Sequence, residues 1–326
     1  MTAYLIRRIL YAVPVIVGVN LITFVLFFAI TPPETMAYQI LGEKNTTQAD
    51  IRNWLAERGY DRPLLWNPQA SGWAKLTDTI FFKKTVPLFW FDFGASDQDR
   101  RMIGTEIRRR MGPSLLIATP TFLAGLLVNI LVAMTVAYYR GTYLDTGVVV
   151  ICVALMSISV LFYIIAVQYA MGRLWHLFPI SGYDTGLFAL KFTAMPVLIG
   201  VIAGIGGGVR YYRTLFLEEV QKDYVRTARA KGLPESRVLF VHALKNALIP
   251  ILTTVVMSIP FLFMGSLLME NFFAIPGLGS YTIDAIQAKD FAIVRAMVFL
   301  GSVLYIVGLL LTDISYTLVD PRVRLE

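Results

Sequence analysis

The chain contains 326 residues, of which 56% are hydrophobic and only 16% are charged, and its mean hydropathy is +0.64. A soluble domain usually carries about a quarter charged residues, so this composition argues against an ordinary soluble enzyme and indicates a membrane protein. In so apolar a chain we interpret the net charge of +7 as Lys and Arg that anchor cytoplasmic loops, and we expect no nucleic-acid partner.

Six stretches are long and apolar enough to cross a bilayer, which takes about 20 residues. They lie near 9–30, 114–139, 146–171, 193–212, 248–270 and 294–316. The first is too long for the apolar region of a secretory signal, so we expect residues 1–30 to form an uncleaved span. The fourth is short and rich in glycine. The sequence predicts an all-α polytopic membrane protein with about six transmembrane helices.

The basic residues of the short loops predict the orientation. Successive segments between spans fall alternately on the two sides of the membrane. Those on the same side as the N-terminus contain Arg7 and Arg8, then Arg140, then the cluster from Arg210 to Lys245, then Arg322 and Arg324. Such an excess marks the cytoplasmic side. We therefore expect a transmembrane core over 114–320, a short tail over 321–326, and both termini in the cytoplasm.

The long segment 31–113 is predicted to be an external loop with short amphipathic helices. "ADIRNWLAERGYDRPLLWN" suits a helix that ends at Gly59, followed by an extended segment around Pro63. "MIGTEIRRRMGPSLLIA" suits an interfacial helix that meets the second span at Gly112 and Pro113.

Residues 214–247 are predicted to form a cytoplasmic loop with a basic helical hairpin, and the stretch that carries it, "DYVRTARAKGLPESRVLFVHALKNALIP", covers residues 223–250. The first arm is helical by propensity over 218–231. Gly232 suits its C-terminal cap, and Pro234 with Glu235 suits the first turn of a second helix. A merely solvated loop is the plain alternative. Because the hairpin has its own caps and apolar stripes, we expect it to dock on a cytoplasmic partner.

Polar residues inside apolar runs are candidates for function in a membrane protein. Asn129 and Gln168 suit either a translocation path or hydrogen bonds between helices. Glu270 opens "ENFFAIPGLG" near the predicted outer mouth, and three residues that follow favour a bend beside a gate. They are Pro276, Gly277 and Gly279.

Other motifs point away from chemistry in this chain. No G-x-x-x-x-G-K-[ST] motif occurs, so we expect no ATP hydrolysis and no catalytic residue here. His176 and His242 are too separated for a metal site, and Cys152 is the only cysteine, which excludes a cysteine-built cluster. "GIGGG" favours close helix packing or a loosened stretch of span. We expect no cofactor and no metal.

Several stretches together resemble a known family. The hairpin sequence is similar to the coupling segment, or EAA loop, of permeases in binding-protein-dependent ABC importers. "YLIRRILYAVPVIVGVNLITF", "ERGYDRPL", "FDFGAS", "YYRGTYLD", "ENFFAIPGLG" and "DISYTLVDPRVR" resemble segments of the dipeptide, oligopeptide and nickel branch in the same order. The chain departs from the pattern at Arg226-Thr227-Ala228, where the family name expects Glu-Ala-Ala, and at Pro234, where a Ser cap is more typical.

The resemblance implies a type I ABC importer permease fold in a bacterial inner membrane. It implies a second homologous permease, as a heterodimer, two ATPase subunits that carry ATP and Mg, and an extracytoplasmic substrate-binding protein. It also implies that the hairpin couples to an ATPase. The residues assigned to that coupling are Arg226, Ala228, Ala230, Lys231, Gly232, Leu233, Pro234, Glu235 and Ser236.

Peptides are the expected cargo, while a dipeptide, oligopeptide, modified peptide, metal chelate or oligosaccharide all remain open. A secondary ion-coupled transporter is the main alternative. The missing inverted repeat and the scarcity of buried carboxylates argue against that class. A membrane-embedded enzyme is a third hypothesis, and no clustered His, Asp or nucleophile arrangement favours it.

Overall fold

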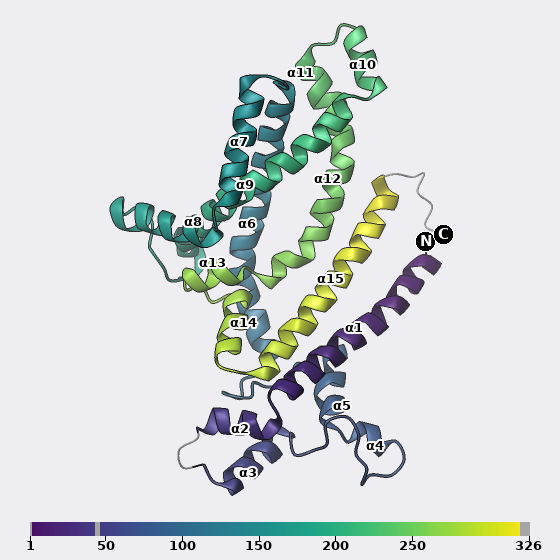
Figure 1. Cartoon of the computed structure of the whole chain (residues 1–326), viewed down its shortest axis with the longest axis vertical. Coiled ribbons are helices and arrows are strands. Elements are labelled where there is room, and N and C mark those ends of the chain that lie inside the picture. The colour runs from purple at the N-terminus through teal and green to yellow at the C-terminus, as the bar shows by residue number, and fades with distance from the viewer. Residues whose placement is uncertain (1, 43–45, 320–326) are drawn as a thin grey trace. The chain divides into compact units, whose positions relative to one another are not determined.

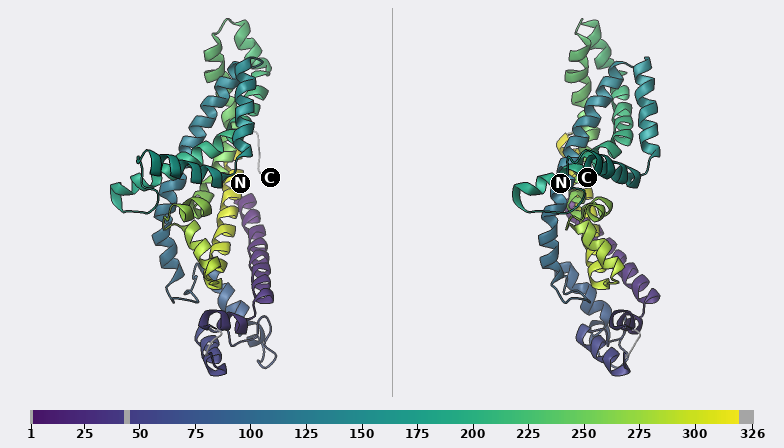
Figure 2. Two further views of the ribbon diagram at one scale, coloured as in Figure 1. Left: turned by 60° about the vertical axis from the view of Figure 1, so that its left-hand side comes forward. Right: turned by 90° about the vertical axis from the view of Figure 1, so that its left-hand side faces the viewer.

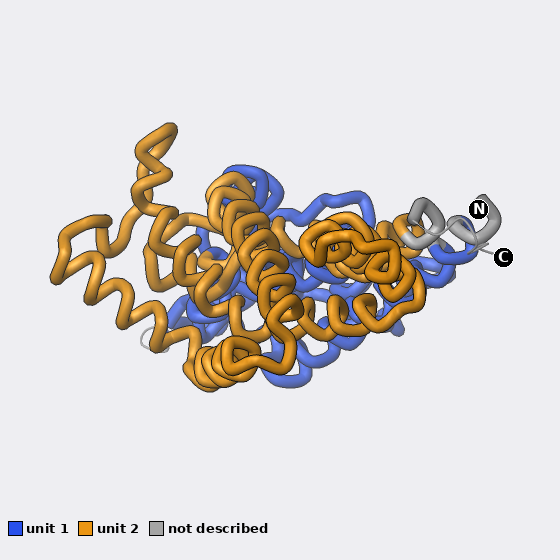
Figure 3. The backbone as a smooth tube through the Cα atoms, turned by 90° about the horizontal axis from the view of Figure 1, so that it is seen from above, with its two compact units in different colours: residues 1–110, 281–307, 326 blue, residues 111–280, 308–325 orange. Residues whose placement is uncertain are grey.

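The structure is a computed structural model that describes residues 2–42 and 46–319 (Figure 1). The described residues form helices, and they contain no β-strand beyond one isolated bridge between Ala95 and Met102. The all-α class is therefore confirmed. The predicted tail over 321–326 lies outside the described residues. The chain divides into two compact units, coloured in Figure 3, which are described separately below.

The first unit contains residues up to 110 and residues 281–307. Its elements before residue 103 are α1 (Thr2–Ile30), α2 (Pro33–Leu41), α3 (Gln48–Arg58), α4 (Ala74–Thr77), α5 (Ile80–Thr85) and the 3-10 helix η1 (Val86–Trp90). Thr47 and Asp50 form a capping box at the start of α3, and Gly59 ends it in the left-handed region at φ 66°. The predicted helix that ends at Gly59 is confirmed.

A shared apolar core joins these short helices to the end of α1. Phe24 and Phe28 of α1 are buried together with Trp54 of α3, Tyr60 and Ile80. The stacked rings of Trp54 and Tyr60 lie 5.9 Å apart. The segment after α1 is thus a folded module rather than a linker.

A buried polar network fastens the loop before α6 to the start of α15 (Phe291–Val319). The Asp97 carboxylate accepts hydrogen bonds from the Tyr60 hydroxyl at 2.8 Å and from the Ala292 N–H at 3.2 Å. The Asp290 carboxylate accepts one from the Asp97 N–H at 3.3 Å. Burial raises the pKa of Asp97, and the nearby Arg295 charge opposes that rise.

The helix α6 (Ile103–Tyr138) is continuous, and our prediction of a junction at Gly112 and Pro113 is wrong. A proline removes a single N–H donor, which a membrane helix tolerates when neighbouring groups compensate for it. The expected interfacial helix and the second span are one element.

The second unit contains residues 111–280 and the described residues from 308 on. Its further elements are α7 (Tyr143–Ser157), α8 (Val160–Val167), the π-helix η2 (Gln168–Leu174), η3 (Gly186–Phe188), α9 (Ala189–Val220), α10 (Asp223–Ala230), α11 (Glu235–Arg237), the π-helix η4 (Val238–Ala243), α12 (Leu244–Ser258), η5 (Ile259–Met264), α13 (Leu267–Phe272) and the start of α14 (Leu278–Gln287). Apolar residues of α6, α7, α9 and α12 form one buried cluster, which includes Cys152.

Within the described residues, five helical stretches are long and apolar enough to cross a membrane. They are Ile6–Ile30, Ile103–Tyr138, Gly186–Val220, Glu235–Phe272 and Phe291–Ser315. The bent pair Tyr143–Ser157 and Val160–Leu174 provides a sixth if it counts as one span. The expectation of about six spans is confirmed.

The third predicted span, 146–171, is not one straight helix. The chain bends by 90° between α7 and α8 (Figures 1 and 2). Ile158 is extended at ψ 129°, and the Ser159 side chain caps α8 by accepting a hydrogen bond from the Leu161 N–H. The Tyr163 hydroxyl donates to the Leu155 carbonyl across the break at 2.8 Å. These bonds satisfy backbone groups that the interrupted helix leaves open.

The glycine-rich fourth span is an unbroken helix, α9, and its glycines allow close packing. A Cβ on Gly206 would lie 2.6 Å from the Cys152 carbonyl oxygen of α7. A Cβ on Gly208 would lie 2.2 Å from the Asn129 side chain of α6. Gly207, between them, has open space at the same position. Close packing, rather than a loosened span, explains this stretch.

We predict that Gly206→Ala and Gly207→Ala have opposite effects on stability. The first forces a methyl group against the α7 backbone and should destabilise the protein by about 1–3 kcal/mol. The second adds helix propensity in open space and should leave stability unchanged or raise it by up to about 1 kcal/mol. Thermal unfolding in detergent measures both, and equal shifts in Tm would contradict the packing of α9 on α7.

Candidate functional site

The predicted basic hairpin lies between α9 and α12, and Figure 1 shows α10 and α11 beyond the ends of those two helices. The first arm differs from the expected continuous helix over 218–231. Helix α9 continues to Val220, the chain turns at Gln221 and Lys222, and α10 begins at Asp223. Lys222 is extended at ψ 151°, and the Asp223 carboxylate occupies the first turn, where the helix dipole favours negative charge.

The tight turn of the hairpin depends on Gly232, which adopts φ +75°. Its N–H donates to the Arg229 carbonyl at 2.9 Å, and the Leu233 N–H reaches the Ala228 carbonyl at 3.4 Å. The predicted glycine cap is confirmed. Pro234 lies one position earlier than expected, because it is the extended N-cap of α11 and its carbonyl accepts from the Arg237 N–H at 2.9 Å.

The hairpin has a small apolar core of its own. Val225 and Val238 are fully buried, Ala228 is 5% exposed, and Tyr224 and Leu233 pack against them. Ala228 was assigned to the docking surface, but its side chain points into this core. The structure therefore gives Ala228 a packing role.

Two polar contacts brace the hairpin. The Arg229 guanidinium pairs with the Glu235 carboxylate across the turn, with Nε to Oε2 at 3.0 Å, and this pairing raises the pKa of Arg229. At the base, the Tyr224 hydroxyl donates to the Glu219 carboxylate of α9. Burial and this hydrogen bond raise the pKa of Tyr224 to about 12, so its hydroxyl stays protonated at neutral pH.

Most of the residues assigned to coupling are accessible at the tip of the hairpin. The exposed ones are Arg226, Ala230, Lys231, Gly232, Pro234 and Ser236, while Leu233 and Glu235 are half-buried. Phe240 and Val241 of η4 are 57% and 51% exposed, and sequence reasoning missed them. The signal was the run "VLFV", since four consecutive apolar residues cannot all face one side of a helix.

The segment predicted as a bend beside a gate is organised around Glu270. This side chain has no exposed surface. Its carboxylate accepts hydrogen bonds from the Ser266 N–H at 3.1 Å and the Ser280 N–H at 3.0 Å. The Ser114 hydroxyl of α6 accepts from the Leu278 N–H at 2.7 Å in the same cluster. Glu270 thus satisfies backbone donors of an irregular segment and faces no open path in this structure.

The glycines around Glu270 are needed for space as well as for bending. A Cβ on Gly277 would lie 2.2 Å from the Glu270 carboxylate, and one on Gly279 would lie 2.7 Å from the Leu267 N atom. A Cβ on Gly265 would lie 2.1 Å from the same carboxylate, and Gly265 adopts φ +72°. Pro276 is the exposed member of the predicted bend. The assignment of this segment to a gate stays a prediction.

The two intramembrane amides have different environments. The Gln168 side chain donates to the Ile180 carbonyl at 3.1 Å and the Phe272 carbonyl at 3.3 Å, so it links segments within the unit. Asn129 is 8% exposed and lies beside Gly208, and its Oδ1 has no hydrogen-bond partner among the described residues. A small pocket between α6 and α9 contains Asn129 in its wall. The contacts of Gln168 favour the hydrogen-bonding alternative, whereas for Asn129 the path remains a prediction.

Comparison with known proteins identifies the kind of membrane protein that this arrangement belongs to. Residues 105–325 match a protein family described as the inner membrane component of binding-protein-dependent transport systems. The match covers both the hairpin and the Glu270 segment.

Full-length relatives agree with this match. A Brucella abortus protein named as a peptide transport system permease is 32% identical over 342 aligned positions, which cover 100% of both chains. The oligopeptide transport system permease protein of Bacillus subtilis is 29% identical, over 99% of this chain and 100% of the relative. The dipeptide transport system permease protein of Escherichia coli K12 is 27% identical over 99% of each chain.

We predict that Glu270→Gln loosens the segment that follows α13. The amide keeps the size of the side chain but loses the charge and half of the acceptor capacity, which should cost about 3 kcal/mol. Hydrogen exchange measured over 276–282 should become faster. Glu218→Gln, at an exposed position of α9, is the control and should change nothing. Unchanged exchange in Glu270→Gln would contradict the organising role of Glu270.

Proposed function

Because the chain belongs to the family of inner membrane components of binding-protein-dependent transport systems, we propose that it forms half of the translocation path of an ATP-driven peptide importer. Membership makes the chain a multi-pass permease of the plasma membrane, and it implies ATPase and substrate-binding partners. The permease is not itself a catalytic subunit. Because the chain belongs to this family, we set aside the alternative of an ion-coupled secondary transporter.

The finer part of the proposal is that the hairpin docks on an ATPase subunit. A docking element must be stiff and must present an accessible surface, and the observation that carries the proposal is the combination of both in one hairpin. The internal core of Val225, Ala228 and Val238 and the cap at Gly232 make it stiff. The tip from Ala230 to Ser236 is largely exposed.

The chemistry of the exposed surface suggests what the ATPase contributes. Arg226, Lys231 and Arg237 are exposed cations, and Phe240 with Val241 forms an exposed apolar patch on the second arm. Such a surface suits a groove with an apolar floor and acidic edges. We propose that Phe240 and Val241 extend the docking surface beyond the residues assigned from the sequence.

The connections of the hairpin explain how docking would move the spans. One arm follows α9 directly after the turn at Gln221, and the other continues through η4 into α12. A force on the tip would therefore act on two spans at once. The Tyr224–Glu219 hydrogen bond keeps the first arm fixed to α9 during such a movement. A flexible Gly/Ser linker would absorb the motion instead.

The nature of the cargo follows from the relatives. Their names assign them to peptide, oligopeptide and dipeptide transport systems, and we propose peptides as the cargo class of this chain. We further propose a heterodimer with a second permease, and a binding protein that delivers the peptide. The predicted placement of both termini and of the hairpin in the cytoplasm belongs to this proposal.

Co-purification from the native host in mild detergent tests the assembly. We expect the tagged chain to recover a second permease and ATP-hydrolysing subunits. Recovery of the chain alone, with solute transport driven by an ion gradient, would overturn the proposal.

We predict that Gly232→Val uncouples transport from ATP hydrolysis, whereas Gly232→Asn does not. Both side chains have open space, but only Asn tolerates the left-handed φ of this position. In proteoliposomes with the complete importer, the valine variant should lose at least about tenfold in transported peptide per ATP, since a strain of about 1–2 kcal/mol opens the turn. Wild-type coupling in Gly232→Val would argue against the hairpin as the coupling element.

A further inference from the structure

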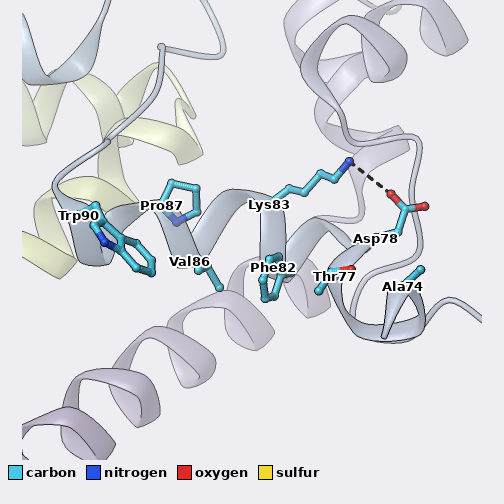
Figure 4. Close-up of a pocket in the computed structure, with 8 residues that line it drawn as sticks. All are labelled: Ala74, Thr77, Asp78, Phe82, Lys83, Val86, Pro87 and Trp90. Carbon is cyan, nitrogen blue, oxygen red and sulfur yellow. Dashed lines mark ion pairs between the residues drawn. The ribbon is translucent and has the colours of Figure 1, made fainter. Parts of the chain in front are cut away.

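Helices α5 and η1 of the first unit carry apolar side chains that are partly exposed in the described part of the chain. Phe82, Val86 and Trp90 line one pocket along this short helical segment. Phe82 is 37% exposed and Trp90 is 75% exposed. Figure 4 shows these three side chains in the lining of a pocket that Thr77, Asp78 and Lys83 also line, with Lys83 extending toward Asp78.

The depth of this face follows from how α5 packs on the first membrane span. Ile80 is fully buried in a cluster with Phe24 and Phe28 of α1. The ring of Phe81 meets that of Phe24 at 5.2 Å, edge to face. Phe24 lies six residues before the end of α1 at Ile30, or about 9 Å along the helix axis. The segment α5–η1 therefore lies beside the last turns of a transmembrane helix, at the level where the span leaves the hydrocarbon.

The same turns of α1 identify what surrounds α5. Ile22, Leu26 and Ile30 of α1 are 62%, 55% and 78% exposed. In a membrane protein such residues contact lipid. They lie on the side of α1 away from Phe24 and Phe28, so lipid is present at the level of α5, where Trp side chains concentrate between hydrocarbon and headgroups.

The charges next to the apolar face suit phospholipid headgroups. Lys83 pairs with Asp78 at 3.3 Å, and Arg62 pairs with the same carboxylate. Arg62 also lies 3.9 Å from the Asp61 carboxylate, so this edge holds two cations and two anions, and the Lys83 side chain stays 46% exposed. An apolar face bordered by charged side chains is the pattern of helices that lie in the interface plane.

We propose that α5 and η1 form an interfacial helix, which inserts Phe82, Val86 and Trp90 into the leaflet where α1 ends and holds Lys83 at the level of the lipid phosphates. The occupant of the pocket in Figure 4 is a phospholipid acyl chain. The helix thereby anchors the module after α1 to the membrane surface.

Two adjacent positions provide a matched test. Phe82→Cys and Lys83→Cys, each in a Cys152→Ala background of the full chain in phosphatidylethanolamine–phosphatidylglycerol nanodiscs, carry a nitroxide label. We expect the ratio of oxygen accessibility to nickel-chelate accessibility to be severalfold higher at position 82 than at position 83. Equal ratios, with water access at both, would overturn the proposal. Protection of position 82 from both reagents would also overturn it, because a protein partner would then cover the face.

A second measurement needs no cysteine substitution. Brominated phospholipids quench tryptophan that is inserted in the bilayer, and Trp90 is one of five tryptophans in the chain. We expect the quenched share of the fluorescence to fall clearly in Trp90→Phe. The same quenched share as in the wild type would contradict insertion of Trp90.

Discussion

Inside a lipid bilayer no water is available to hydrogen-bond the backbone, so every N–H and C=O must find a partner within protein. This constraint explains where the chain stays helical and how it departs from a helix. At the bend between α7 and α8, the Ser159 side chain and the Tyr163 hydroxyl take over backbone bonds that the helix gives up. After α13, the buried Glu270 carboxylate does the same for the N–H groups of Ser266 and Ser280. Polar side chains in the second unit thus permit irregular backbone at defined places.

Glycine serves this architecture in two different ways. On α9, Gly206 and Gly208 let helices approach so closely that a Cβ would meet another element. At Gly232 there is ample space, and the requirement is instead a positive φ that turns the chain between two helices. The first use fixes a packed core, and the second produces a stiff hairpin with an exposed tip. Together they provide what a coupling mechanism requires, namely a rigid lever attached to rigid spans.

Local signals in the sequence were sufficient for much of this. The caps at Gly59 and Gly232 and the apolar runs of the spans each depend on a few neighbouring residues, and the structure confirms them. The bend at Ile158 was missed although Ser157 and Ser159 flank it and the compensating bonds are local, because neither serine is a strong helix breaker. The role of Glu270 was also out of reach, since Ser114 is more than 150 residues away in the chain. The packing role of Ala228 was missed for a similar reason. Helical spacing alone does not show that this side of α10 is already covered by Val238 of the second arm.

Site-specific photo-crosslinking in native membranes tests most directly the claim that the tip of the hairpin contacts an ATPase subunit. A photoreactive amino acid at Lys231 probes the exposed tip, and the same group at Glu218 probes an exposed position on α9. We expect position 231 to crosslink to a nucleotide-binding ATPase and position 218 to do so far less. An ATPase crosslinked equally from both positions, or from neither, would contradict the claim.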